Sequence, residues 1–193
     1  MGVRAFVFKN RGALLVIPAL ILAVFGKPNT DSILAGLPTA FAGEAIRCWA
    51  VGYSGTTTRA DQVTAPQLVT AGPYAYVRNP LYIGNFLTAL GFAVAFTGNN
   101  TETERWVLIG ISLATMLAVY ATIIPHEENF LRATFGATFD EYASRVGRVV
   151  PRWPQPSAPQ LGSYDASVIA RAETRTFITF AVMLGILGLK AIL

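Results

Sequence analysis

Two polar blocks decide how this chain is organised: QLVTAGPYAYVRNPLY at residues 67–82 and HEENFLRATFGATFDEYASRVGRVVPR at residues 126–152. Each block adjoins an apolar run long enough to cross a bilayer, and two such runs, at about 81–98 and 106–125, lie between the blocks. Two crossings in succession return a chain to the side that it left. The sequence therefore predicts that both blocks lie on the same side of a membrane, where they close around one cofactor.

The composition is that of a membrane protein. Of 193 residues, 53% are hydrophobic and only 13% are charged, whereas soluble domains carry about 25% charged residues. The formal charge of +4 is not gathered into a basic stripe with interleaved aromatic residues, so we expect no nucleic-acid partner. With Cys48 and His126 as the only residues of their kinds, we expect neither an intramolecular disulfide nor a metal site.

Five apolar runs predict an all-α, polytopic membrane protein with about five transmembrane helices, folded as one domain over residues 1–193. The runs cover residues 12–25, 33–53, 81–98, 106–125 and 176–193. The first run follows Arg4, Lys9 and Arg11, as in a signal peptide, but it lacks a small-residue cleavage site before Lys27. We therefore expect it to be a retained helix, and we expect 176–193 to be an additional C-terminal transmembrane helix.

The positions of the basic residues predict the orientation. With a cytoplasmic N-terminus and five crossings, 11 of the 15 Lys and Arg residues fall on the cytoplasmic side: Arg4, Lys9, Arg11, Arg59, Arg78, Arg132, Arg145, Arg148, Arg152, Arg171 and Arg175. This asymmetry satisfies the positive-inside rule. We therefore expect a multi-pass protein whose N-terminus and cofactor site are cytoplasmic.

The second run contains two ionisable residues. Glu44 and Arg47 are three residues apart and so lie on one helix face. Charged side chains at membrane depth normally face the interior of a helix bundle or a polar cavity. We favour an ion pair inside the bundle; the alternative is that the two residues form a wall of the active site.

The second polar block has the spacing of an amphipathic helix across residues 126–153. Its apolar positions are Phe130, Leu131, Thr134, Phe135, Phe139, Tyr142 and Val146. Four prolines then predict a stiff, extended connector before the last helix: Pro151, Pro154, Pro156 and Pro159. We therefore expect a cytoplasmic amphipathic segment that lies on the membrane face or packs on the bundle.

The first block combines a turn with a helix start. Gly72-Pro73 predicts the turn, and Asn79-Pro80 predicts a helix start with Asn79 as its cap. The free N–H groups of a helix start favour an anion, and Arg78 would reinforce them. The block also offers three rings for stacking and hydrogen bonding: Tyr74, Tyr76 and Tyr82. The alternative is an aromatic belt with a basic anchor at the membrane interface.

The second block begins with an acidic pair, Glu127-Glu128, directly after an apolar run. Interfacial anchors on the cytoplasmic side are usually basic, so this pair indicates a site for a cationic group or for ribose hydroxyls. The alternative is a solvated helix start, where acidic residues are favourable. We interpret His126 as a polar surface residue rather than a base.

Together the two blocks resemble the isoprenylcysteine carboxyl methyltransferase family. The resemblance rests on L-V-T-x-G-P-Y-x-Y-V-R-N-P-L-Y and on E-E-x-x-L-x-x-x-F-G-x-x-F-x-x-Y-x-x-R-V, and it covers about residues 59–152. Related phospholipid N-methyltransferases share the general plan. The resemblance implies an integral-membrane methyltransferase that uses S-adenosyl-L-methionine, with the cytoplasmic amphipathic segment near the C-terminus covering the bound cofactor. It also implies that the enzyme methylates a lipophilic or lipid-modified acceptor that enters from the bilayer.

The resemblance also implies roles for individual residues. The implied cofactor contacts are Pro66, Gln67, Leu68, Val69, Tyr74, Asn79, Pro80, Leu81, Tyr82 and Glu127, with Arg59 as a weaker candidate. Glu128 and Arg145 are the implied catalytic residues. Tyr142 and Arg145 are also expected to brace the covering segment, and Glu128 or His126 would accept a proton if one must leave.

Two departures from the family pattern concern the acceptor. Asn79 stands where the family usually has histidine, and Ile123 stands where the prenylcysteine enzymes have a substrate-binding arginine. Because isoleucine cannot bind a carboxylate, both an isoprenylcysteine carboxylate and a lipid amine stay open as acceptors. Two other functions also stay open: an NADPH-dependent membrane reductase of the sterol-reductase type, and a non-catalytic membrane scaffold of the same fold.

Overall fold

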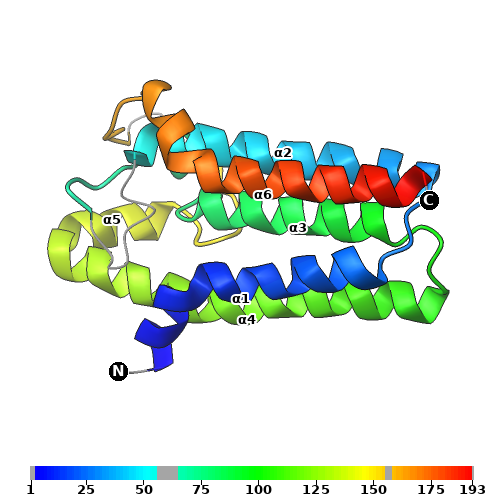
Figure 1. Cartoon of the computed structure of the whole chain (residues 1–193). Helices are drawn as coiled ribbons and strands as arrows, with labels where there is room; N and C mark the ends of the chain where they lie inside the picture. Colours follow the sequence, from blue (N-terminus) through cyan, green and yellow to red (C-terminus); the bar gives the residue numbers. More distant parts are fainter. Residues whose placement is uncertain (1–2, 56–64, 155–157, 193) are drawn as a thin grey trace.

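The computed structural model describes residues 3–55, 65–154 and 158–192, with the side chains from Phe6 onward, and this part of the chain is helical, as expected. Five long helices lie side by side, and a short helix and several loops gather at one end of them (Figure 1). The helices are α1 (Val3–Phe25), α2 (Thr30–Ser54), α3 (Pro80–Phe96), α4 (Glu102–Phe135), α5 (Ala137–Arg145) and α6 (Ser167–Ile192), with a 3₁₀ turn η2 (Gly72–Ala75).

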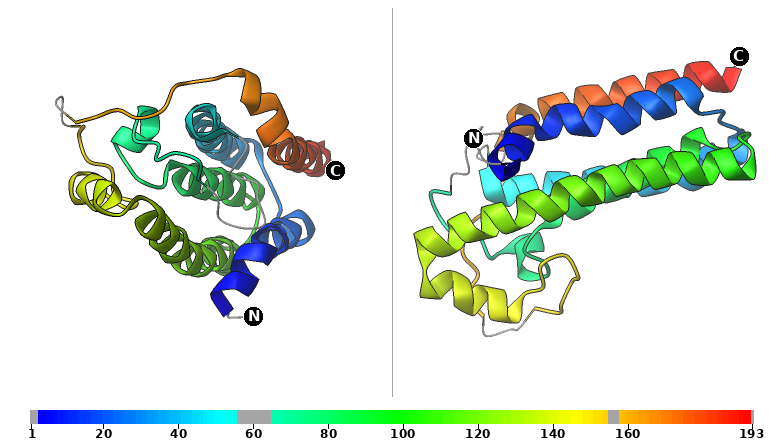
Figure 2. Two further views of the ribbon diagram at one scale, coloured as in Figure 1. Left: turned by 90° about the vertical axis from the view of Figure 1, so that its left-hand side faces the viewer. Right: turned by 90° about the horizontal axis from the view of Figure 1, so that it is seen from below.

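Three of the helices, α1, α4 and α6, are long and apolar enough to cross a membrane. The expected spans at 33–53 and 81–98 correspond to α2 and α3, which lie in the same bundle (Figure 2). Helix α2 carries three ionisable residues, Asp31, Glu44 and Arg47, and α3 has 17 residues, about 26 Å at 1.5 Å per residue. The charged residues of α2 and the shorter length of α3 explain why these two helices are not among those long and apolar enough to be recognised as membrane spans.

Helices α2 and α3 pack closely because glycines face each other at two levels. A Cβ atom on Gly91 would lie 2.3 Å from the Ala40 nitrogen, and one on Gly43 would lie 2.5 Å from the Gly84 carbonyl oxygen. Gly36 makes a similar approach to the Gly91 carbonyl. Small residues let helix backbones approach in membrane proteins, where packing replaces the hydrophobic effect as the driving force. This seven-residue glycine spacing on both helices holds α3 against α2.

An internal ion pair joins α6 to these two helices. The Arg47 Nη2 atom lies 2.6 Å from the Glu173 Oε2 atom, and the Arg47 Nε atom lies 3.8 Å from the Glu44 Oε2 atom. Arg47 also donates to the Asn85 side chain on α3 and to the Thr176 hydroxyl on α6. The prediction of an ion pair inside the bundle is confirmed, but the shortest carboxylate contact of Arg47 is with Glu173, which precedes the predicted last run at 176–193 and lies within α6.

The loops at the far end of the bundle hold each other in place. The Asn99 amide donates to the Lys27 carbonyl oxygen over 2.7 Å, and the Lys27 amide donates to the Asn100 side chain over 2.9 Å. Asn29 caps α2, and Thr101 caps α4 in a reciprocal arrangement with Glu104. These contacts fix the turn between α3 and α4, and with it the register of α4 against α3.

The prediction of one amphipathic helix across 126–153 is wrong. Helix α4 continues through Pro125 to Phe135 without a break and ends where Gly136 adopts a φ of 53°. Glycine tolerates this left-handed conformation, and the chain then turns into α5, which runs back toward the start of α3 (Figure 2). After Arg145 the chain leaves the helix and bends, and Val77 pairs with Gly147 in an isolated parallel bridge.

We expect Gly91→Ala to lower the stability of the protein, because the added methyl group would overlap the α2 backbone. Overpacking of this kind costs about 1–3 kcal/mol. Gly110→Ala is a matched control, since Gly110 also lies inside a long helix but a Cβ atom there would meet nothing within 4 Å. Thermal unfolding in detergent measures both variants; equal midpoints would contradict the close approach of α2 and α3.

Candidate functional site

The two polar blocks meet at a cavity of about 150 Å³ at the end of the bundle that holds α5. The lining residues come from the end of α2, the loop before η2, η2 itself, the start of α3, the end of α4, and α5: Ser54, Ala65, Pro66, Gln67, Leu68, Val69, Tyr74, Arg78, Asn79, Glu128, Leu131, Phe139 and Tyr142. One side of the cavity is apolar, and the other carries charged and amide groups.

The charged side is built around the Glu128 carboxylate, which is almost completely buried. Its Oε1 atom accepts hydrogen bonds from Arg78 Nε over 2.9 Å and from Asn79 Nδ2 over 3.2 Å. Its Oε2 atom accepts from Arg148 Nε over 2.9 Å, with Arg148 Nη2 at 2.7 Å. Two guanidinium groups therefore neutralise one carboxylate, and both of its oxygens are occupied.

Backbone hydrogen bonds join the same two segments. The Arg78 amide donates to the Gly147 carbonyl oxygen over 2.9 Å, and the Arg152 amide donates to the Tyr76 carbonyl oxygen over 2.8 Å. The Asn79 side chain also donates to the Arg148 carbonyl oxygen over 3.0 Å. Asn79 is the N-cap residue of α3 and Pro80 begins the helix, as predicted, but the Asn79 side chain makes these contacts and no capping hydrogen bond.

Two tyrosines line the cavity close to the charged side. The Tyr142 hydroxyl donates to the Tyr74 carbonyl oxygen over 2.8 Å, which ties α5 to η2. Burial raises the pKa of Tyr74 to about 12, and burial also raises the pKa of Tyr142 well above its usual value. Both phenols therefore keep their protons at neutral pH and offer hydroxyl groups and ring faces to a ligand.

The structure brings together only some of the predicted site residues. Those that line the cavity are Pro66, Gln67, Leu68, Val69, Tyr74, Asn79 and Glu128. Those outside its lining are Pro80, Leu81, Tyr82, Glu127 and Arg145. Arg59 lies outside the described residues. The functional roles assigned to all of these residues stay predictions.

Tyr82 and Glu127 form a separate pair between α3 and α4. The Tyr82 hydroxyl donates to the Glu127 Oε1 atom over 2.8 Å, and the Tyr82 ring lies 4.6 Å from the Tyr120 ring. Buried apolar side chains adjoin this pair, among them Phe8 of α1 and Ile123 of α4. The two adjacent acidic side chains therefore lie in different environments: Glu127 faces the helix interface between α3 and α4, and Glu128 faces the cavity.

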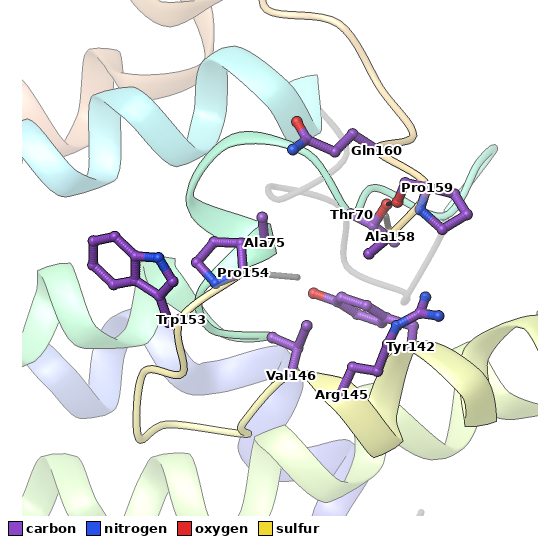
Figure 3. A pocket seen from close by; sticks show the side chains of 10 residues that line it. All are labelled: Thr70, Ala75, Tyr142, Arg145, Val146, Trp153, Pro154, Ala158, Pro159 and Gln160. Atoms are coloured by element: carbon purple, nitrogen blue, oxygen red, sulfur yellow. Dashed lines mark hydrogen bonds between the residues drawn. The ribbon is translucent and has the colours of Figure 1, made fainter. Parts of the chain in front are cut away.

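Arg145 and Tyr142 line a smaller hollow of about 20 Å³ next to the main cavity (Figure 3). Its opposite wall is the connector before α6, where the Thr70 hydroxyl donates to the Pro159 carbonyl oxygen over 2.9 Å. The Thr70 and Ala71 amides both donate to the Leu161 carbonyl oxygen. The connector thus covers the outer side of Tyr142, while Arg145 itself pairs with Glu141 at 2.5 Å.

The structure adds lining residues that the sequence did not assign to the site, chiefly Arg78, with Ser54, Leu131 and Phe139. It also adds Arg148, which lies outside the lining and binds the Glu128 carboxylate from behind. Arg78 was expected only to stand beside an anion, and Arg148 was counted only for topology. The sequence signal that points to both arginines is Glu128, an acidic residue directly after an apolar run, with an arginine-bearing segment on either side of it in the sequence. A carboxylate that is buried there needs charged partners, because buried charges are paired.

The chain belongs to the phospholipid methyltransferase family, whose sequence profile matches residues 32–138, more than half of its length. The match runs from α2 to the first residues of α5 and includes both sides of the cavity. With three helices apolar and long enough to cross a membrane, this family membership identifies an integral membrane protein. No solved structure matches the chain significantly.

Curated relatives confirm the resemblance to the isoprenylcysteine methyltransferases. A probable protein-S-isoprenylcysteine O-methyltransferase of Oryza sativa subsp. indica is 32% identical over 120 residues, which are 60% of this chain and 59% of that protein. The protein-S-isoprenylcysteine O-methyltransferase of Schizosaccharomyces pombe is 34% identical over 87 residues, 45% of this chain and 34% of that protein.

A bacterial relative carries a different name. The nickel-cobalt-cadmium resistance protein NccN of Alcaligenes xylosoxydans xylosoxydans is 35% identical over 86 residues, 45% of this chain and 37% of that protein. Across residues 3–55, 65–154 and 158–192, no three His, Cys, Asp or Glu side chains gather in a way that could hold a metal ion. In all three comparisons the matched part is less than two thirds of the relative's own length.

We expect Glu128→Gln to destabilise the pocket, because it leaves the Arg78 and Arg148 guanidinium groups without a counter-charge. The expected loss is about 1.5–3 kcal/mol, the scale of hydrogen bonds to charged groups. Asp140→Asn is the matched control, since Asp140 pairs with Arg132 at 2.7 Å on the surface, where such pairs contribute about 0–1 kcal/mol. Thermal unfolding compares the two variants, and equal effects would show that the Glu128 cluster is not structural.

Proposed function

We propose that this protein is an S-adenosyl-L-methionine-dependent membrane methyltransferase that acts on a lipophilic acceptor. The observation that carries the proposal is the cavity itself, since both polar blocks contribute to it and α3 and α4 hold them at one end of the bundle. The distribution of basic residues favours the cytoplasmic side for this end. The covering segment would be α5 together with the residues that follow it.

The lining residues fit the chemistry of this cofactor. The apolar side, with Leu68, Leu131 and Phe139, suits a purine ring, and Tyr74 and Tyr142 add stacking faces. The Arg78 side chain suits a carboxylate, whereas the two N–H groups of the Asn79 side chain already donate to Glu128 and Arg148. The Gln67 side chain and the backbone before η2 can bind hydroxyl groups. When bound, the cofactor would supply the methyl group from its sulfonium centre.

The chain's own residues would act mainly through alignment and exclusion of water. Glu128 acts in this proposal as a positioning residue rather than a base, because both of its oxygens already accept hydrogen bonds. It holds Arg78 at the cavity wall and ties Arg148, behind the wall, to the same carboxylate. Arg145 would act from the neighbouring hollow by keeping α5 in place over the cofactor.

The environment of Ile123 favours an amine over a carboxylate as the acceptor. Ile123 is fully buried in an apolar cluster and offers no positive charge to a carboxylate. The ionisable partner on the same stretch of α4 is Glu127, bonded to the Tyr82 hydroxyl, and a carboxylate attracts an ammonium headgroup. A lipid amine that reaches this stretch from the bilayer therefore fits the charges better than an isoprenylcysteine carboxylate.

A large side chain placed in the cavity should weaken cofactor binding. Leu131→Trp places an indole in the cavity, and we expect the affinity for S-adenosylhomocysteine to fall at least about tenfold, or 1.4 kcal/mol. Leu117→Trp is the matched control on the same helix, because the Leu117 side chain is 58% exposed on the outside of the bundle. Isothermal titration calorimetry in detergent or nanodiscs measures both variants.

The same assay separates the three candidate functions. A methyltransferase binds S-adenosylhomocysteine, a sterol-reductase-like enzyme binds NADPH, and a non-catalytic scaffold binds neither. Incubation with radiolabelled S-adenosylmethionine and total membrane lipid then identifies the acceptor through the labelled product. Binding of NADPH alone, or of neither ligand, would overturn the proposed reaction.

A further inference from the structure

We propose that residues 149–153 (VVPRW) form a membrane anchor that seats the pocket end of the protein in the headgroup region of an anionic leaflet. This segment follows α5 and lies outside all helices, yet it presents large apolar side chains to the surroundings. The exposed fractions are 46% for Val149, 72% for Val150 and 87% for Trp153. The proposal concerns the surface and does not depend on the reaction proposed above.

The segment is held in this exposed position by its own backbone contacts. A Cβ atom on Gly147 would lie 2.0 Å from the Val150 carbonyl oxygen, so only glycine permits this tight turn. On either side of the turn, the Gly147 carbonyl accepts from the Arg78 amide and the Arg152 amide donates to Tyr76. Val149 and Val150 therefore project because the turn is fixed, and Trp153 lies at the far edge of the hollow from Arg145 (Figure 3).

Aromatic contacts connect the segment to the outer surface of the bundle. The Trp153 ring lies 5.9 Å from the Tyr76 ring, which lies 6.2 Å from the Trp49 ring on α2. Trp49 is itself exposed, on a helix that also exposes Leu34 and Phe41. These exposed side chains extend the lipid-facing surface of α2 toward the segment 149–153. Trp and Tyr residues concentrate at the membrane–water interface, which is where this surface ends. Lipid is therefore the occupant that this surface fits.

The charges indicate which lipid. Arg152 is exposed, and half of the Arg148 side chain is exposed although its guanidinium group binds Glu128. Both arginines flank the apolar side chains of the segment, and basic residues beside interfacial aromatics attract anionic headgroups. Arg148, directly before the segment, accepts a hydrogen bond from Asn79 and donates one to Glu128, so lipid contact on residues 149–153 would act on two residues that line the pocket.

The three tryptophans of the chain make the test direct. In Trp49→Phe/Trp106→Phe, Trp153 is the only emitter, and a thermal melt checks that the protein is folded. After reconstitution in phosphatidylcholine vesicles, we expect lipids brominated near the headgroup to reduce the emission roughly by half, as for an interfacial indole. Lipids brominated at the chain end should quench less, and acrylamide should quench far less than for N-acetyltryptophanamide.

The proposal would be overturned if brominated lipid did not quench the Trp153 emission and acrylamide quenched it as strongly as it quenches N-acetyltryptophanamide. The indole would then lie in water, either free or as part of a surface for a protein partner. The anionic preference has its own test. Phosphatidylglycerol should increase quenching by shallow brominated lipid in the Trp153-only protein, and Arg152→Gln should reduce this increase. Equal quenching with and without phosphatidylglycerol would overturn the anionic preference.

Discussion

One buried carboxylate, that of Glu128, holds the candidate site together. It binds Arg78 and Asn79 from the segment that enters α3, and Arg148 from the segment that follows α5. Burying a carboxylate is costly unless it is paired and hydrogen-bonded, and here charged and amide donors occupy both oxygens. Because the two segments are separated by two bundle helices in the sequence, this interaction exists only when the whole fold is formed.

The bundle brings these groups within reach through helix packing, loop contacts and one internal ion pair. Gly43 and Gly91 let α3 lie directly on α2, and the loop contacts of Asn99 and Asn100 fix where α4 begins. Helix α4 then extends past the start of α3, so that Glu128 stands opposite Asn79. On the same side of the bundle, Arg47 and Glu173 hold α6 against α2, which sets where the connector crosses over Thr70.

The sequence predicts the helical class and the meeting of the two polar blocks, because apolar run length and the number of crossings are local properties. It predicts less well what depends on tertiary contacts. Asn79 has the signature of a helix cap, but the buried Glu128 recruits its side chain. The amphipathic spacing of 126–153 hides the break at Gly136, and no local feature marks Glu173 as the partner of Arg47. Membership of the phospholipid methyltransferase family agrees with the motifs from which the resemblance was drawn.

The central claim is that both polar blocks bind one molecule of S-adenosyl-L-methionine. Ultraviolet cross-linking of the radiolabelled cofactor to the purified protein, followed by peptide mapping, tests it most directly. The account predicts adducts in residues 65–79 and also in residues 128–142, both suppressed by excess S-adenosylhomocysteine. Adducts confined to other parts of the bundle, or labelling that the competitor leaves unchanged, would contradict it.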